Sequence, residues 1–298
     1  MTLMGAISFG CGRLAGGASS AGSQRLLATA LDAGVAALDV APSYGLGLAE
    51  QVVGGIVQDY PQVRITTKVG QPVPRFGHAK SLARMAKRTL QGSSPRSLDG
   101  YRPLQPPRAY GTGEFTTRSM VRSLHRSVQR LGRIDRALLH DCAPAEIGED
   151  ALSAYSAACA ELGIQPGYAF QAIWNEETGG AFPADFAGQA ALDPDWLIAA
   201  PQGRPARPIT FHSLLQAASW NASRDSSFAG RWDKAARVIG MADGPARIAA
   251  ILAHVHVRFP DSGLIISSTN QTRLENLLAA IRRVDKERLL GEVSAVFG

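Results

Sequence analysis

Short apolar runs rich in β-branched residues alternate along the chain with longer stretches in which apolar residues recur at helical spacing. This alternation is typical of repeated βα units around a parallel sheet. The short runs predict strands at residues 7–11, 36–40, 64–69, 135–140, 167–172, 196–200, 208–213 and 263–269. Helical spacing predicts helices over residues 23–32, 49–57, 116–131, 145–162, 246–258 and 272–282. Strands that alternate with helices in this number favour a closed (β/α)8 barrel, the TIM barrel.

A doubly wound open sheet is the competing architecture, and it would place a glycine-rich phosphate-binding turn directly after the first strand. Gly10, Gly12, Gly16 and Gly17 do follow that strand, but their spacing is off by one residue from the dinucleotide-binding pattern. We therefore expect a barrel that residues 1–298 form as a single domain, since this chain length is usual for the fold.

Residues 71–113 form the one long segment that fits no βα rhythm, and they are rich in Pro, Gly, Ser and Arg. They carry eight basic residues against one acid, a local charge of +7, whereas the whole chain carries +6. Because the rest of the chain is nearly neutral, a nucleic-acid-binding face spread over the fold is not expected. We interpret the segment as a loop insertion after the third strand, on the catalytic face of a barrel, which either favours anions or is simply solvated.

The remaining composition argues against several classes of protein. The first residues lack the basic start and uninterrupted apolar run of a signal peptide, and no stretch reaches the roughly 20 apolar residues of a membrane span. Cys11, Cys142 and Cys159 have neither metal-ligand spacing nor the even count of a disulfide framework. We expect a cytoplasmic protein with no bound metal and no membrane or nucleic-acid partner, and nothing in the sequence indicates its oligomeric state.

Polar side chains stand at the predicted carboxyl ends of three consecutive strands. The second strand ends at Asp39 and is followed by Tyr44. The third strand has Lys68 near its end, and the fourth ends at His140. Because the carboxyl ends of barrel strands converge on one rim, these four side chains are expected to share a pocket.

This set of residues has the chemistry to move one proton. A phenol is a weak acid with a pKa of about 10, and a neighbouring ammonium group such as that of Lys68 lowers this value. Asp39 is placed to keep a buried Lys68 charged. His140 can hydrogen-bond a substrate carbonyl and polarise it. Such a site gives or takes a proton while another group moves a hydride.

Several segments resemble the aldo-keto reductase family. Similarity to the family's motifs is found in ALDAGVAALDVAPSYGLGLAE, RITTKVG, FTTRSMVRSLHRSVQRLG, DRALLHD and LIISSTNQTRLENLLAAI. The resemblance implies a catalytic tetrad of aspartate, tyrosine, lysine and histidine. Carried over by position, the tetrad is Asp39, Tyr44, Lys68 and His140, with Tyr44 as the general acid that protonates a carbonyl oxygen as hydride arrives.

The resemblance also implies a nicotinamide cofactor that lies extended across the mouth of the barrel. Its phosphate would be bound at the last strand and helix, where the family pattern matches Ser267, Ser268, Arg273 and Asn276. A guanidinium and hydroxyl donors near a helix amino terminus suit a phosphate dianion, so NADP(H) is favoured over NAD(H). The other residues expected to bind the cofactor are Gly10, Cys11, Gly12, Gln171, His212 and Ser213.

The chain departs from the family pattern around the expected nicotinamide site. Residues 169–171 read Ala-Phe-Gln where the family has a polar Ser-Asn pair, and Gln171 is the candidate substitute. The sixth predicted strand has alanine at 199 and 200, where the family often has a glutamine. On the seventh strand, His212 occupies the position of the aromatic ring that stacks on nicotinamide.

We hypothesise an NADPH-dependent reductase of an aldehyde, ketone or sugar, with acidic substrates favoured by the +7 insertion. Two alternatives stay open. The altered nicotinamide site suits a regulatory or scaffold barrel that binds a nucleotide without turnover. The same tetrad working in reverse suits an NAD-dependent sugar dehydrogenase.

Overall fold

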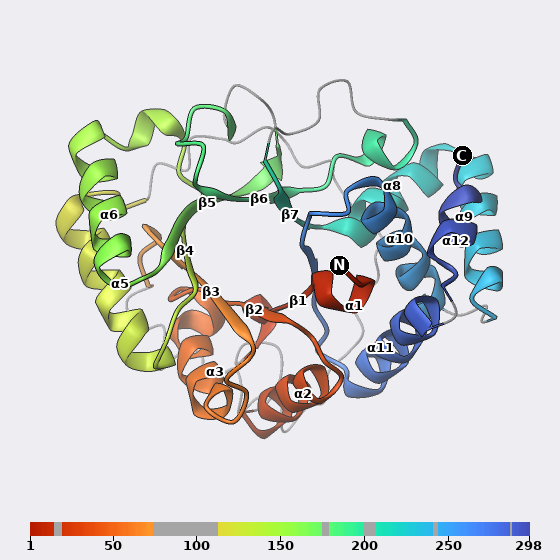
Figure 1. Ribbon diagram of the computed structural model, residues 1–298, viewed down its shortest axis with the longest axis horizontal. Coiled ribbons are helices and arrows are strands. Elements are labelled where there is room, and N and C mark those ends of the chain that lie inside the picture. The colour runs from red at the N-terminus through yellow and green to blue at the C-terminus, as the bar shows by residue number, and fades with distance from the viewer. Residues whose placement is uncertain (15–19, 74–112, 175–178, 200–206, 241–243, 287) are drawn as a thin grey trace.

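Parallel strands form a closed barrel in the computed structural model, which describes residues 1–14, 20–73, 113–174, 179–199, 207–240, 244–286 and 288–298 (Figure 1). The strands are β1 (Ile7–Gly10), β2 (Ala37–Asp39), β3 (Arg64–Val69), β4 (Arg136–His140), β5 (Gln165–Ile173), β6 (Ala187–Ala191), β7 (Ile209–His212) and β8 (Leu264–Ile266). Each strand pairs with its neighbours in chain order, and β8 closes the ring against β1. The predicted (β/α)8 barrel is confirmed.

Helices flank the ring of strands on most sides, while the described residues between β6 and β7 contain no α-helix (Figure 1). The helices are α1 (Leu3–Ala6), α2 (Ser20–Asp32), α3 (Ala49–Val57), α5 (Thr117–Leu131), α6 (Glu149–Glu161), α8 (Leu214–Arg224), α9 (Ser226–Val238), α10 (Gly244–Arg258), α11 (Gln271–Lys286) and α12 (Leu290–Ala295). The predicted helices correspond to α2, α3, α5, α6, α10 and α11. Apolar spacing did not predict α8 and α9.

Helix α5 shows how the sequence specifies these elements. It begins after Thr116, whose side chain accepts a hydrogen bond from the backbone amide of Ser119, and it ends at Gly132, whose φ of 80° favours glycine. Its apolar residues recur every third or fourth position, and Met120, Leu124 and Leu131 are buried. The other face, rich in arginine, is left toward solvent.

The sixth strand was predicted in the wrong place. Residues 194–197 form a 3-10 turn, η4 (Pro194–Leu197), and residue 200 lies outside the described chain. The strand is instead β6, an Ala-Gly-Gln-Ala-Ala segment poor in β-branched residues. This segment becomes a strand because it pairs with β5 on one side and with β7 on the other. The pairing outweighs the weak β-propensity of its residues. Trp196, in the apolar run that predicted a strand, instead packs its ring against Phe211 and Phe259.

The predicted insertion at 71–113 lies mostly outside the described residues, which resume at 113. The prediction of a basic loop on the catalytic face therefore stays a prediction. In the part of the chain that the structure describes, none of the helices combines the length and the apolar composition of a membrane span.

Candidate active site

The predicted tetrad comes together at the carboxyl ends of the strands. Asp39 ends β2 and His140 ends β4, while Lys68 lies near the end of β3. Tyr44 begins the 3-10 turn η2 (Tyr44–Gly47), which follows β2 and brings the phenol back over the rim. These side chains border one cavity of about 730 Å³, which we call the carboxyl-end cavity.

Lys68 and Asp39 form a buried ion pair at the base of this cavity. The Lys68 Nζ donates to both Asp39 carboxylate oxygens at 2.6 and 2.8 Å, and both residues are almost inaccessible to solvent. Burial by itself lowers the pKa of Lys68, but attraction to Asp39, and secondarily to Tyr44, outweighs burial and raises the pKa above its ordinary value. The lysine is therefore held as an ammonium group.

The phenol of Tyr44 accepts a hydrogen bond from the same ammonium group, with 2.9 Å between Nζ and the phenolic oxygen. Burial is the largest influence and raises the pKa of Tyr44, the Lys68 charge lowers it, and the Asp39 charge raises it again. The net direction is upward. The sequence-based prediction that Lys68 lowers the pKa of Tyr44 has the correct direction for that contact. It omitted the larger effect of burial, which disfavours the charged phenolate and raises the pKa.

His140 is a neutral imidazole at this site. Burial, followed by the charges of Lys68 and His212, lowers the pKa of His140 to about 3. Its ring meets that of Tyr44 edge-on, with 5.7 Å between centroids. A neutral imidazole at neutral pH offers one N–H donor to a ligand oxygen and does not itself release a proton there.

Gln171 and the residue after His140 form a polar pair beside the tetrad. Asp141, which has a φ of 53°, accepts hydrogen bonds from the backbone amide and the side-chain Nε2 of Gln171, at 2.7 and 2.9 Å. Burial raises the pKa of Asp141, and the bonds from Gln171 oppose that shift. One N–H of the Gln171 amide group is therefore engaged by Asp141.

His212 borders the same cavity and has a fixed orientation. Its Nε2 lies 2.7 Å from the carbonyl oxygen of Phe170, and its Nδ1 lies 2.9 Å from the Ser213 hydroxyl. Because a carbonyl oxygen only accepts, the hydrogen of the neutral ring is assigned to Nε2, and the Ser213 hydroxyl donates to Nδ1. Burial is the largest cause of the lowered pKa of His212. The His212 imidazole is thus neutral and is held in one orientation at the wall of the cavity.

Gln189 is a residue of this cavity that the sequence-based prediction missed. It lies on β6, level with Ala169 of β5, and borders the cavity while Ala199 does not. Its side-chain Oε1 is buried and has no hydrogen-bond partner among the described residues. The signal for Gln189 in the sequence is that it is the one polar residue in a run of Ala and Gly. The segment at 196–200 is more apolar, and for that reason the sequence pattern predicts the strand there instead.

The residues predicted to bind cofactor divide into those that border the cavity and those that do not. The first group is Gly10, Gly12, Gln171, His212, Ser213 and Ser267. Cys11 is fully buried in the core, with its thiol directed to the carbonyl oxygen of Phe9. Ser268 is engaged with the backbone of Asn270 just before α11. Arg273 in the first turn of α11 and Asn276 one turn later are both exposed, beyond the cavity itself.

A (β/α)8 barrel that keeps a protonated phenol beside a buried ammonium group at its carboxyl rim has the framework of an enzyme that transfers protons. The sequence then identifies the family. The family model named Aldo/keto reductase family matches residues 4–162, and the chain belongs to this family of oxidoreductases.

Solved structures with the same fold are also aldo-keto reductases. One from Klebsiella pneumoniae, in complex with NADPH, is 18% identical, with 98% of this chain and 90% of that chain covered and a TM-score of 0.58. One from Bacillus halodurans, in its holo form, is 14% identical over 97% of this chain and 91% of that chain, with a TM-score of 0.59. At these identities the likeness shows the fold. A comparison with curated proteins found no match.

Proposed function

We propose that this protein is an NADPH-dependent reductase of aldehydes, ketones or sugars, with Tyr44 as general acid. The observation that carries the proposal is the contact chain from Asp39 through Lys68 to Tyr44 inside the carboxyl-end cavity. A carbonyl oxygen that gains electrons needs a proton, and a buried phenol beside an ammonium group is a donor suited to that step. General acid catalysis of this kind contributes roughly 10²- to 10⁴-fold in rate.

The proton step follows from the charges around Tyr44. The phenol gives its proton to the carbonyl oxygen, and the phenolate that remains is stabilised by the Lys68 ammonium group 2.9 Å away. Asp39 keeps that ammonium group charged throughout. The N–H of neutral His140 donates to the same carbonyl oxygen and orients the carbonyl toward Tyr44.

A nicotinamide group fits the residues present. The buried, unpartnered Oε1 of Gln189 suits the NH₂ of a carboxamide, and the Gln171 carbonyl oxygen is a second acceptor on the same cavity. The ring of His212 offers a flat neutral surface for stacking. A bound nicotinamide would supply the hydride that reduces the carbonyl carbon.

The preference for NADP(H) over NAD(H) rests on the region where β8 leads into α11. Ser267 borders the cavity, and the exposed Arg273 lies in the first turn of α11, whose amino terminus favours an anion. The Klebsiella pneumoniae relative in complex with NADPH supports the same choice at the level of the family.

The proton donor is tested with Tyr44→Phe. We expect turnover of a panel of aldehydes, ketones and sugars to fall by at least about 10²-fold, because the proton donor is lost while the ring is kept. The measurement is cofactor consumption followed by absorbance. Tyr60→Phe is the matched control, since Tyr60 bonds Asp32 on the outside of the barrel. Full activity in Tyr44→Phe would refute the assignment.

Cofactor choice is tested by fluorescence titration of the protein with NADPH and with NADH. We expect NADPH to bind at least about 10-fold more tightly, because one charge-assisted hydrogen bond is worth roughly 1.5–3 kcal/mol. Equal or tighter binding of NADH would favour the NAD-dependent sugar dehydrogenase instead.

One observation favours a second candidate, a barrel that binds a nucleotide without turnover. Ala169 and Phe170 stand on β5 where the family has polar groups, and Phe170 packs against Tyr168 and Phe182. Cofactor binding without turnover of any carbonyl in the panel would support this candidate.

A further inference from the structure

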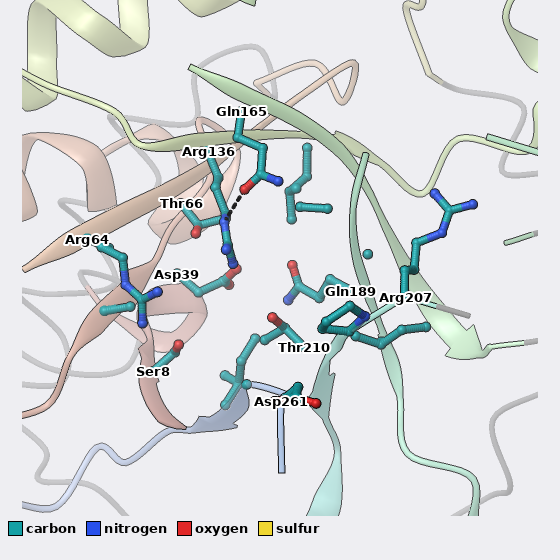
Figure 2. Close-up of a pocket in the computed structure, with 18 of the residues that line it drawn as sticks. Ser8, Asp39, Arg64, Thr66, Arg136, Gln165, Gln189, Arg207, Thr210 and Asp261 are labelled. Atoms are coloured by element: carbon teal, nitrogen blue, oxygen red, sulfur yellow. Dashed lines mark hydrogen bonds between the residues drawn. The ribbon is translucent and has the colours of Figure 1, made fainter. Parts of the chain in front are cut away.

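A second cavity opens at the opposite end of the barrel, where the strands begin (Figure 2). Its volume is about 410 Å³, within the range of roughly 300–1,000 Å³ typical of small-ligand pockets. We call it the amino-end cavity. Residues at or near the beginnings of several strands line it, among them Ser8, Ala37, Arg64, Arg136 and Thr210, together with residues of the segments that precede the strands.

Several side chains that line the amino-end cavity are small. Barrel interiors are ordinarily filled by layers of bulky branched residues. Here Leu138 and Ile265 are accompanied by five small residues, Ser8, Ala37, Thr66, Ala187 and Thr210. Three of these five carry hydroxyl groups, and a polar cavity holds water or a ligand, whereas an apolar one of this kind stays dry.

Two arginines on adjacent strands stand at one side of the cavity mouth. Arg64 begins β3 and Arg136 begins β4, and in Figure 2 Arg64 lies to the left of the cavity and Arg136 at its upper left, beside Gln165. The Arg136 Nε donates to the neutral Oε1 of Gln165 at 2.8 Å. In the described part of the chain, no carboxylate forms an ion pair with either arginine.

The electrostatics of the pair favour an anion beside it. Burial is the largest cause of the lowered pKa of Arg136, repulsion from Arg64 adds to it, and Asp135 partly opposes both. The Asp135 carboxylate accepts from the backbone amide of Ile65. An anion between the two guanidinium groups would relieve their repulsion.

The other charged groups on the cavity do not take that place. The Asp39 carboxylate already accepts from Lys68 with both oxygens. Arg207 donates to the backbone carbonyls of residues 182, 183 and 186. Asp185 and Asp261 are exposed at the rim, and Asp261 lies across the cavity from Arg64 and Arg136 in Figure 2.

We propose that the amino-end cavity is a second binding site, which takes a small molecule bearing a carboxylate or phosphate group, with that group held between Arg64 and Arg136. Planar guanidinium groups bind such oxyanions through paired hydrogen bonds. The Thr66 and Thr210 hydroxyls would bind polar groups on the remainder of the ligand, deeper in the cavity. The site is separate from the carboxyl-end cavity, although Asp39 and Gln189 border both.

The test is calorimetric titration of the full chain with inorganic phosphate and, separately, with succinate, at low ionic strength and without cofactor or carbonyl substrate. We expect at least one of the two to bind, and Arg64→Gln and Arg136→Gln each to weaken it at least about 10-fold, the loss of one charge-assisted contact. Phosphate binding alone identifies a phosphorylated ligand, and succinate binding alone identifies a carboxylic acid.

Two further variants locate the binding. Arg122→Gln removes an exposed charge from the outside of α5 and should bind as tightly as the unaltered chain, whereas Arg273→Gln reports any separate binding at the expected cofactor-phosphate site. Because Arg136 is half-buried, circular dichroism checks its folding, and the exposed Arg64 decides the outcome if Arg136→Gln unfolds. No binding of either anion, or binding that survives both cavity variants, would overturn the proposal.

The proposal is independent of reductase activity. Its readout is binding in the absence of cofactor and substrate, so an inactive protein that binds succinate or phosphate at Arg64 and Arg136 would still support it. Conversely, an active reductase whose anion binding is lost only in Arg273→Gln would contradict it, because the anion would then occupy the cofactor end.

Discussion

Two buried charges of opposite sign set the properties of the candidate site at the scale of single residues. Lys68 and Asp39 are each almost inaccessible to solvent and form an ion pair with 2.6 Å between the Lys68 Nζ and an Asp39 carboxylate oxygen. Removal of one partner from such a pair leaves an uncompensated buried charge and ordinarily costs roughly 3–5 kcal/mol. The neutral groups around them, Tyr44 and His140, are held neutral by burial. The site therefore places a protonated phenol and a neutral imidazole beside a fixed ammonium group.

Gln189 tests the nicotinamide part of the proposal at the same scale. Gln189→Leu keeps the size of the side chain but removes the acceptor proposed for the carboxamide. We expect the dissociation constant for NADPH to rise about 10-fold, the value of one hydrogen bond, as measured by fluorescence titration. Gln129→Leu, at an exposed position of α5, is the control. Unchanged affinity in Gln189→Leu would show that the carboxamide binds elsewhere.

At the scale of elements, a polar network ties β3 to the helices α3 and α5. The Thr67 hydroxyl donates to Glu50 Oε1 at 2.8 Å, and Arg130 Nη1 donates to Glu50 Oε2 at 2.9 Å. Glu50 is almost fully buried, and these two partners give each of its carboxylate oxygens a hydrogen bond. The network brings the two helices into close contact, and Gly54 of α3 lies at that contact.

Two adjacent glycines of α3 give a matched test of this packing. A Cβ at Gly54 would lie 1.9 Å from the carbonyl oxygen of Arg130, so Gly54→Ala should lower the free energy of unfolding by about 1–3 kcal/mol. A Cβ at Gly55 would meet nothing within 4 Å, so Gly55→Ala should raise it by about 0.5–1 kcal/mol. Urea denaturation measures both. Equal effects of the two substitutions would show that the helices are not in close contact.

At the scale of the whole molecule, the barrel has a cavity at each end, and the two cavities are lined by largely different polar residues. The carboxyl-end cavity contains the residues that we propose for proton transfer, and the amino-end cavity contains the arginine pair. On the outside of the barrel, α10 contributes His254, whose side chain contacts two segments that are distant from it in the sequence. Its Nε2 lies 3.0 Å from the Leu197 carbonyl oxygen and its Nδ1 3.0 Å from the Ser294 hydroxyl of α12.

His254 makes stability depend on pH. Burial, the largest cause, lowers its pKa in the folded protein to about 4 from the ordinary 6.5, so the unfolded chain binds more protons between these values. Stability from this group is complete above pH 6.5 and is lost as the pH falls toward 4. We expect the free energy of unfolding to drop by about 2 kcal/mol from this residue between pH 7 and pH 5.

Urea denaturation at both pH values measures that drop. His254→Gln should show a smaller drop, and His125→Gln, at an exposed position of α5, should keep the full one. The same pH dependence in His254→Gln as in the unaltered chain would assign the effect to other groups.

The fold and the tetrad were predictable because their signals are local. Apolar periodicity marks strands and helices within short windows, and residues at the ends of consecutive parallel strands must meet at one rim. Asp39, Lys68 and His140 needed only a correct placement of β2, β3 and β4. The position of β6 was not predictable in this way, because a run of Ala, Gly and Gln becomes a strand only when neighbours on both sides supply its hydrogen bonds.

The sequence by itself thus determined the closed barrel, the four residues that gather at its carboxyl rim and the family to which the chain belongs. Only the tertiary structure decided that Gln189 borders the carboxyl-end cavity, that the pKa of Tyr44 is raised, and that a cavity with an arginine pair opens at the other end. The physical reason is the same for all three. Burial, desolvation and cavity volume are sums over side chains from many strands, and no short window of sequence contains them.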